Sequence, residues 1–158
     1  MVHRGIATLS GALMVCFFLL ATWEPQFFLL HFYQALVYLV IILLLFYFED
    51  HWAYAMGMQV PIVWIGLTSF GTGLLGGALQ QAMRFLRGQG VTNRTGPMAL
   101  VIAVLGIALF LTCMRHWRKE ISGLRIARPT FAISAVIVLI YYSILINWFW
   151  RMVPQTSS

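Results

Sequence analysis

The stretch FFLLHFYQALVYLVIILLLFYF, residues 27–48, decides the fold, because it contains no formally charged side chain over its whole length. An α-helix rises 1.5 Å per residue, so this segment would extend about 33 Å. The hydrocarbon core of a bilayer is ~30 Å thick, so the segment is long enough to cross a membrane with some tilt. We therefore predict a transmembrane helix that is ended by Glu49 and Asp50.

Four more apolar segments have the same character. Each is at or above the ~18 residues that a spanning helix requires. They lie at residues 5–23, 61–83, 97–114 and 130–150. Together with residues 27–48 they predict an all-α polytopic membrane protein, a bundle of five transmembrane helices that forms one domain over residues 1–158.

The prolines and tryptophans support this division of the chain independently of hydropathy. Four prolines lie at the start of a predicted span, where a missing backbone N–H leaves no helical hydrogen bond unmade. They are Pro25, Pro61, Pro97 and Pro129. In this interpretation no proline interrupts a span. The six tryptophans lie near predicted helix ends, where amphipathic rings favour the membrane interface.

The composition also indicates a membrane protein. Charged residues make up 9% of the chain, whereas a soluble domain carries about 25%. The net charge is +6, but Lys and Arg lie in short links between apolar segments, so we expect lipid rather than nucleic acid as the partner. The link after residue 114 predicts contacts with anionic headgroups. The residues expected to make them are Arg118, Lys119, Arg125 and Arg128.

The distribution of basic residues favours one orientation only slightly. Five spans place six Lys and Arg residues on the side of the N-terminus and four on the other side. The positive-inside rule then favours a cytoplasmic N-terminus in a plasma membrane or bacterial inner membrane. So small an excess leaves open a dual topology with antiparallel dimers.

Small residues form one face of the segment 61–83. They recur at helical spacing. Gly73 and Gly77 are four residues apart, and small residues at this spacing allow two helix backbones to approach closely. Van der Waals contact between the helices then replaces the hydrophobic effect, which lipid cannot supply. The residues of this face are Gly66, Ser69, Gly73, Gly76 and Gly77. We predict that the face packs against a neighbouring span of the same chain, with a second copy or another membrane protein as the alternative.

Polar side chains inside the apolar segments are the candidate ligand-binding residues, because lipid offers them no hydrogen bonds. His31, Gln34 and Tyr38 share one helix face. The others, nearer the ends of two spans, are Gln80, Arg84 and Asn147. A structural hydrogen bond, or snorkelling to the interface for Arg84, is the simpler explanation. Alternatively, these residues line a pocket for a weakly polar or amphipathic molecule.

The acidic residues are predicted to lie outside the spans. Glu49, Asp50 and His51 form one cluster, which we interpret as a solvated stop signal rather than a metal site. Glu24 and Glu120 are assigned to loops. No mid-membrane acid is therefore expected to hold a cationic ligand.

Several enzyme signatures are absent: the chain has no H-E-x-x-H, G-x-S-x-G, Walker-type or C-x-x-C motif. No metal or cofactor is indicated, and we expect no enzymatic activity. Our first hypothesis is a non-enzymatic subunit or scaffold that packs with itself or with other membrane proteins. The alternative is a small-molecule binder or carrier with an intramembrane polar pocket. A quinone- or haem-linked redox subunit that depends on His31 is the weakest hypothesis, because bis-histidine haem needs a second histidine at similar depth.

Overall fold

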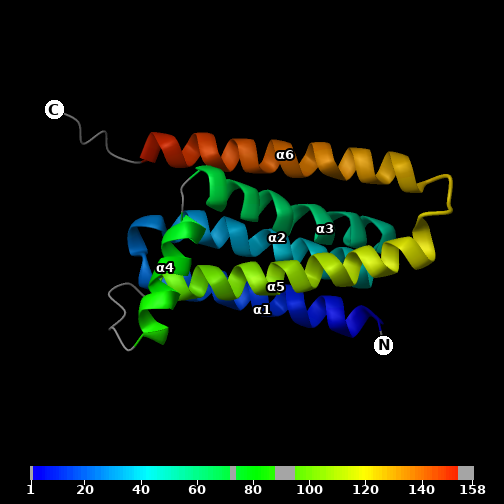
Figure 1. Ribbon diagram of the computed structural model, residues 1–158. Coiled ribbons are helices and arrows are strands. Elements are labelled where there is room, and N and C mark those ends of the chain that lie inside the picture. Colours follow the sequence, from blue (N-terminus) through cyan, green and yellow to red (C-terminus); the bar gives the residue numbers. More distant parts are fainter. Residues whose placement is uncertain (1, 72–73, 88–94, 153–158) are drawn as a thin grey trace.

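The computed structural model of the chain describes residues 2–71, 74–87 and 95–152 (Figure 1). These residues form helices and short links, with no strand among them. Within the same ranges, five helical segments are long and apolar enough to cross a membrane. The predicted all-α bundle of five transmembrane helices is confirmed. The protein is a small multi-pass membrane protein.

The helices run back and forth along one axis, so α1 begins and α6 ends at opposite ends of the bundle (Figure 1). The long helices are, in chain order, α1 (Val2–Trp23), α2 (Phe28–Tyr47), α3 (Asp50–Gly66), α5 (Thr95–His116) and α6 (Ala127–Met152). The shorter elements are a 3-10 turn, η1 (Pro25–Phe27), two π-helical turns, η2 (Leu67–Gly71) and η3 (Trp117–Ile121), and the helix α4 (Leu74–Leu86).

The third span differs from the predicted segment 61–83. It runs from Asp50 to Phe70, and Pro61 lies inside α3 rather than at its start. The expectation that no proline interrupts a span is therefore wrong at Pro61. The helix α4 lies across the bundle at the end where α6 finishes (Figure 1), and it is separate from the third crossing.

The environment of α3 explains this difference. It is the central helix, which packs against α2, α5 and α6, and every residue from Ala53 to Pro61 is buried. A helix surrounded by protein does not need the apolar outer face that lipid demands. Its span accordingly has the lowest mean hydropathy of the five, and the sequence pattern of its first half resembles a polar link.

Glycines allow α3 and α5 to pack closely. A Cβ atom on Gly57 would lie 2.5 Å from the Sγ atom of Cys113, and one on Gly106 would lie 3.1 Å from the Cβ atom of Pro61. Both separations are tighter than ordinary van der Waals contact, so each glycine admits the neighbouring helix. These are the small-residue contacts that hold helices together where lipid removes the hydrophobic driving force.

The predicted small-residue face makes no comparable contact with the described residues. Within residues 2–71, 74–87 and 95–152, no atom of a neighbouring element lies within 4 Å of where a Cβ atom would stand on Gly66, Gly76 or Gly77. Ser69 is half-buried on η2, and Gly73 lies outside the described residues. Contact with a second copy or with another membrane protein therefore stays a prediction for this face.

Candidate functional site

An apolar cavity of about 320 Å³ opens inside the bundle at the end where α1 meets α2. Its walls come from α1, α2, α3, α5 and α6, so segments from nearly the whole chain meet there. Phe17, Trp64, Ala99 and Leu145 are among its apolar lining residues. The polar residues that line it are Glu24, His31, Gln34, Thr68, Thr95 and Tyr142.

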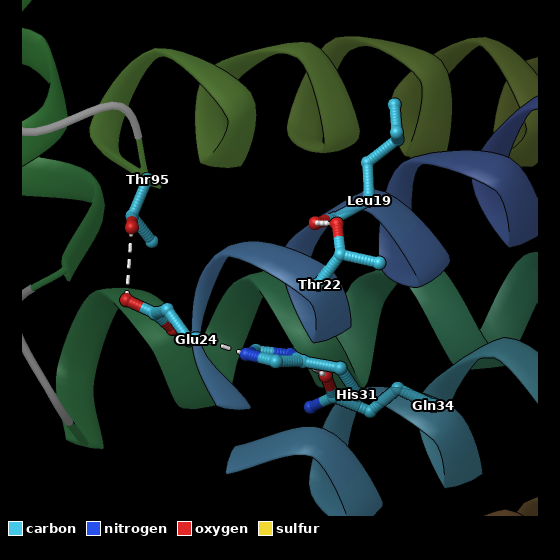
Figure 2. Close-up of polar contacts among 6 residues, drawn as sticks. All are labelled: Leu19, Thr22, Glu24, His31, Gln34 and Thr95. Atoms are coloured by element: carbon cyan, nitrogen blue, oxygen red, sulfur yellow. Dashed lines mark hydrogen bonds and ion pairs between the residues drawn. The ribbon is translucent and has the colours of Figure 1, made fainter. Parts of the chain in front are cut away.

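Glu24 occupies the tight reversal between α1 and α2. Its backbone N–H donates to the carbonyl of Leu20 (2.9 Å), and its own carbonyl accepts from the N–H of Phe27 (2.9 Å). These bonds continue the helical path through the turn, and Pro25 directly after it begins η1. The side chain of Glu24 points into the bundle between Thr95 and His31 (Figure 2). The predicted loop acid is therefore part of the cavity wall.

The carboxylate of Glu24 joins three segments of the chain. Its Oε1 atom accepts a hydrogen bond from the hydroxyl of Thr95 at 2.8 Å. Its Oε2 atom lies 3.1 Å from Nε2 of His31, which is close enough for a hydrogen bond or an ion pair (Figure 2). Because Thr95 is the first residue of α5, the carboxylate also lies at a helix N-terminus, where the helix dipole stabilises a negative charge.

His31 connects this carboxylate to Gln34. Its Nδ1 atom lies 3.3 Å from Oε1 of Gln34, one turn further along α2. A proton on Nε2 donates to Glu24. A second proton, on Nδ1, would donate to the Gln34 oxygen and make the ring a cation paired with the carboxylate. His31 is buried, so this network lies within the bundle.

The helix α4 helps to position Thr95. A Cβ atom on the neighbouring Gly96 would lie 2.6 Å from Oε1 of Gln81 and 3.4 Å from the backbone of Ala78. The start of α5 is therefore tightly packed against α4. This contact holds the Thr95 hydroxyl within reach of Glu24.

The predicted ligand-binding residues separate into two groups. His31 and Gln34 line the cavity, and Tyr38, on the same face of α2, is buried deeper in the bundle. The remaining three are exposed and are not among the lining residues: Gln80, Arg84 and Asn147. The structure therefore brings together part of the predicted set and adds Glu24, Thr68, Thr95 and Tyr142.

Tyr142 is the most informative residue that the sequence analysis missed. It lines the cavity from α6, its side chain is only 3% exposed, and its hydroxyl has no hydrogen-bond partner among the described residues. A buried hydroxyl without a partner is unfavourable. Nothing in the hydrophobic pattern of the α6 sequence distinguishes this tyrosine from Tyr141. For Glu24, by contrast, the sequence did offer a signal. The link between the first two spans is so short that Glu24 has to stay close to the helix ends.

A second polar cluster lies at the opposite end of the bundle. Tyr54 on α3 donates to Glu120 at 3.2 Å, and Glu120 lies 3.1 Å from His116. Glu120 thus ties η3 to the central helix rather than lying in a free loop. The basic residues beside this cluster are exposed, and their contact with anionic headgroups stays a prediction. They are Arg118, Lys119, Arg125 and Arg128.

The cluster at the start of α3 is divided between solvent and protein. Glu49 is exposed, as expected of a stop signal, but His51 is buried. Its Nε2 atom lies 3.1 Å from Oε2 of Glu49, without the alignment of a hydrogen bond. In the described part of the chain, no three His, Cys, Asp or Glu residues are grouped so that they could hold a metal ion.

Replacing Thr95 with valine tests the network. The shape is kept but the hydrogen bond to Glu24 is lost, and an unmet polar group of this kind typically costs about 1–3 kcal/mol. We expect a lower melting temperature in detergent. Thr112→Val on the same helix is the matched control, because among the described residues that hydroxyl bonds only to the carbonyl of Ala108 within α5. Equal melting temperatures for the two variants would contradict the proposed link.

Comparisons with known proteins identify no relative. No family model matches the chain, and searches of curated proteins and of solved structures found no match. The functional argument therefore depends on the chemistry of the cavity.

Proposed function

We propose that this protein binds a small amphipathic molecule inside the membrane, in the cavity between α1, α2, α3, α5 and α6. The observation that carries the proposal is the Glu24–His31–Thr95 network on the wall of an otherwise apolar cavity. Ligand sites in proteins combine apolar walls with a few polar groups that orient the ligand. This arrangement matches that description.

The size of the cavity supports a ligand rather than a packing defect. Protein interiors contain few voids larger than a water molecule. The cavity of about 320 Å³ is roughly twice the ~150 Å³ of an engineered void that binds benzene. It lies at the lower end of the ~300–1,000 Å³ range of small-molecule sites. The natural ligand should therefore be compact, with one or two rings or a short chain.

The contact between η1 and α6 suggests an access route from the lipid to the cavity. Phe27 and Phe149 both line the cavity, and their ring centroids are 5.3 Å apart. The helix α6 packs mainly on α3 and touches α2 only lightly. A molecule dissolved in the bilayer would then enter between α2 and α6, past this aromatic pair.

The positions of the other histidines favour a binder over a redox subunit. The chain has four histidines, and only His31 lines the cavity. His3, His51 and His116 belong to the start of α1, the start of α3 and the end of α5, all at the other end of the bundle (Figure 1). A haem held by two histidines is therefore not part of the proposal.

Filling the cavity tests the proposed function. Ala99 lines it from α5, so Ala99→Phe should place a ring where a ligand would lie. The probes are 3-phenylpropylamine, 3-phenylpropanol and 3-phenylpropanoate, added to the full chain in lipid nanodiscs and followed by calorimetry. We expect the wild type to bind at least one of them and Ala99→Phe to bind none.

The control for this experiment is a substitution of the same size elsewhere in the core. Ala35 on α2 is fully buried but does not line the cavity. Ala99 is equally buried, so both Ala35→Phe and Ala99→Phe should overpack the bundle, which typically costs about 1–3 kcal/mol, but only Ala99→Phe should lose probe binding. The proposal is overturned if none of the probes binds the wild type, or if Ala99→Phe binds them unchanged.

A further inference from the structure

We propose that the molecule bound in this cavity is an amphiphilic amine, a compact apolar body with one ammonium group that pairs with Glu24. The inference rests on the proposed function, because it names the ligand class of the same site. It also revises the expectation that no acid is placed to hold a cation, since Glu24 lies on the cavity wall rather than in an open loop.

The first argument is the remaining capacity of the carboxylate. A carboxylate offers about four lone-pair positions to donors. The two bonds described for Glu24 come from Thr95 and His31, and the side chain of Glu24 keeps 22% of its exposure. An ammonium group in the cavity can therefore donate to the same carboxylate without displacing the Thr95 hydroxyl.

The second argument is the aromatic wall. Phe17, Phe27, Trp64, Tyr142 and Phe149 all line the cavity. The negative faces of aromatic rings attract a cation, and this attraction is stronger when water is excluded. Rings also supply the apolar surface for the body of the ligand, so one wall serves both parts of an amphiphilic amine.

The third argument is the unpartnered hydroxyl of Tyr142. Tyr142 lines the cavity, and its buried hydroxyl lacks a hydrogen-bond partner in the described part of the protein. An ammonium group carries three donors and no acceptor. Once one donor is paired with Glu24, two donors remain, and the Tyr142 hydroxyl is an acceptor that still has no partner among the described residues.

The charge balance of the cavity disfavours the other ligand classes. Among the described residues that line it, Glu24 is the only acid and His31 the only basic side chain. An ammonium ligand brings a positive charge that can pair with the Glu24 carboxylate, whereas a carboxylate ligand brings a second negative charge beside it. Unpaired charge inside an apolar site is unfavourable. A neutral alcohol fits the space but leaves the charge of Glu24 unmatched.

The experiment compares three probes that share one body. The amine and the alcohol share the 3-phenylpropyl group, and the carboxylate keeps the phenyl ring and the three-carbon chain, so their relative affinities report the chemistry that Glu24 recognises. In nanodiscs containing the wild type we expect the amine to bind about tenfold more tightly than the alcohol and the carboxylate to bind least. Glu24→Gln should remove this preference for the amine.

One variant serves as the control. Glu120→Gln removes an acid at the other end of the bundle and should keep the preference. The relative affinities of the wild type for the amine and the alcohol test the inference even if Glu24→Gln fails to fold. Equal binding of amine and alcohol to the wild type, or an unchanged preference in folded Glu24→Gln, overturns this inference and leaves the proposed function standing. Failure of all three probes overturns both.

Discussion

Gly57→Leu is expected to abolish folding of the bundle. Even the first carbon of a side chain at Gly57 would lie 2.5 Å from the Sγ atom of Cys113, which is itself fully buried. A leucine must therefore push α5 away from α3, the central helix. Overpacking of a tight core typically costs about 1–3 kcal/mol and sometimes more, and we expect the upper end or beyond. Loss of the monodisperse peak in detergent and a collapsed melting curve would show it.

Gly76→Leu is the matched control, because no neighbouring element in the described part of the chain comes within 4 Å of a Cβ atom at that position. It should not destabilise the bundle, and the higher helix propensity of leucine should stabilise α4 by up to about 1 kcal/mol. A finer test pairs Gly57→Ala with Cys113→Ala, which removes the obstructing sulfur. The double variant should be more stable than Gly57→Ala alone. Wild-type melting of Gly57→Leu would mean that α3 and α5 do not approach as described.

The second large effect is expected in the coupling between Glu24 and His31. We propose a double-mutant cycle with Glu24→Met and His31→Leu, which remove the polar groups without adding new donors. Neighbouring residues of one hydrogen-bond network couple by about 0.5–3 kcal/mol. We expect the upper half of that range, because the side chains of Glu24 and His31 are only 22% and 10% exposed. Unfolding of the full chain in mixed micelles of increasing denaturing detergent measures the four free energies.

The pair His116 and Glu120 provides the reference for this cycle. Its nitrogen and oxygen atoms are also 3.1 Å apart, but Glu120 is 40% exposed. Exposed pairs of this helical spacing contribute about 0.3–0.5 kcal/mol. The Glu24–His31 coupling should clearly exceed that of the reference pair. If the two couplings were equal, the cavity network would contribute no more than a surface ion pair.

The same comparison of buried and exposed positions shows where prediction from sequence works. Residues 27–48 predict their own helix, because each backbone group in lipid must be satisfied within the segment. That constraint is local, and it holds for the four helices that face lipid along most of their length. It fails for α3, whose first half is enclosed by protein and so does not carry the hydropathy of a lipid-facing helix.

The candidate site shows a similar division. His31 and Gln34 could be predicted, because a polar stripe on an apolar helix has to face protein or a cavity. Thr95 could not, since it lies 71 residues from Glu24 and meets it only when α5 packs beside α1. Tyr142 has no local signal that distinguishes it from its exposed neighbours on α6.

The sequence by itself determined the solvent, the number of crossings and the helical class of this protein. These properties follow from the length and polarity of single segments, because each segment has to satisfy its own backbone hydrogen bonds in lipid. Only the tertiary structure decided that Glu24 faces inward, that α3 is the central helix, and that a cavity exists. Such features depend on how closely helices distant in sequence approach each other, and glycines such as Gly57 set that separation through contacts that hydropathy does not record.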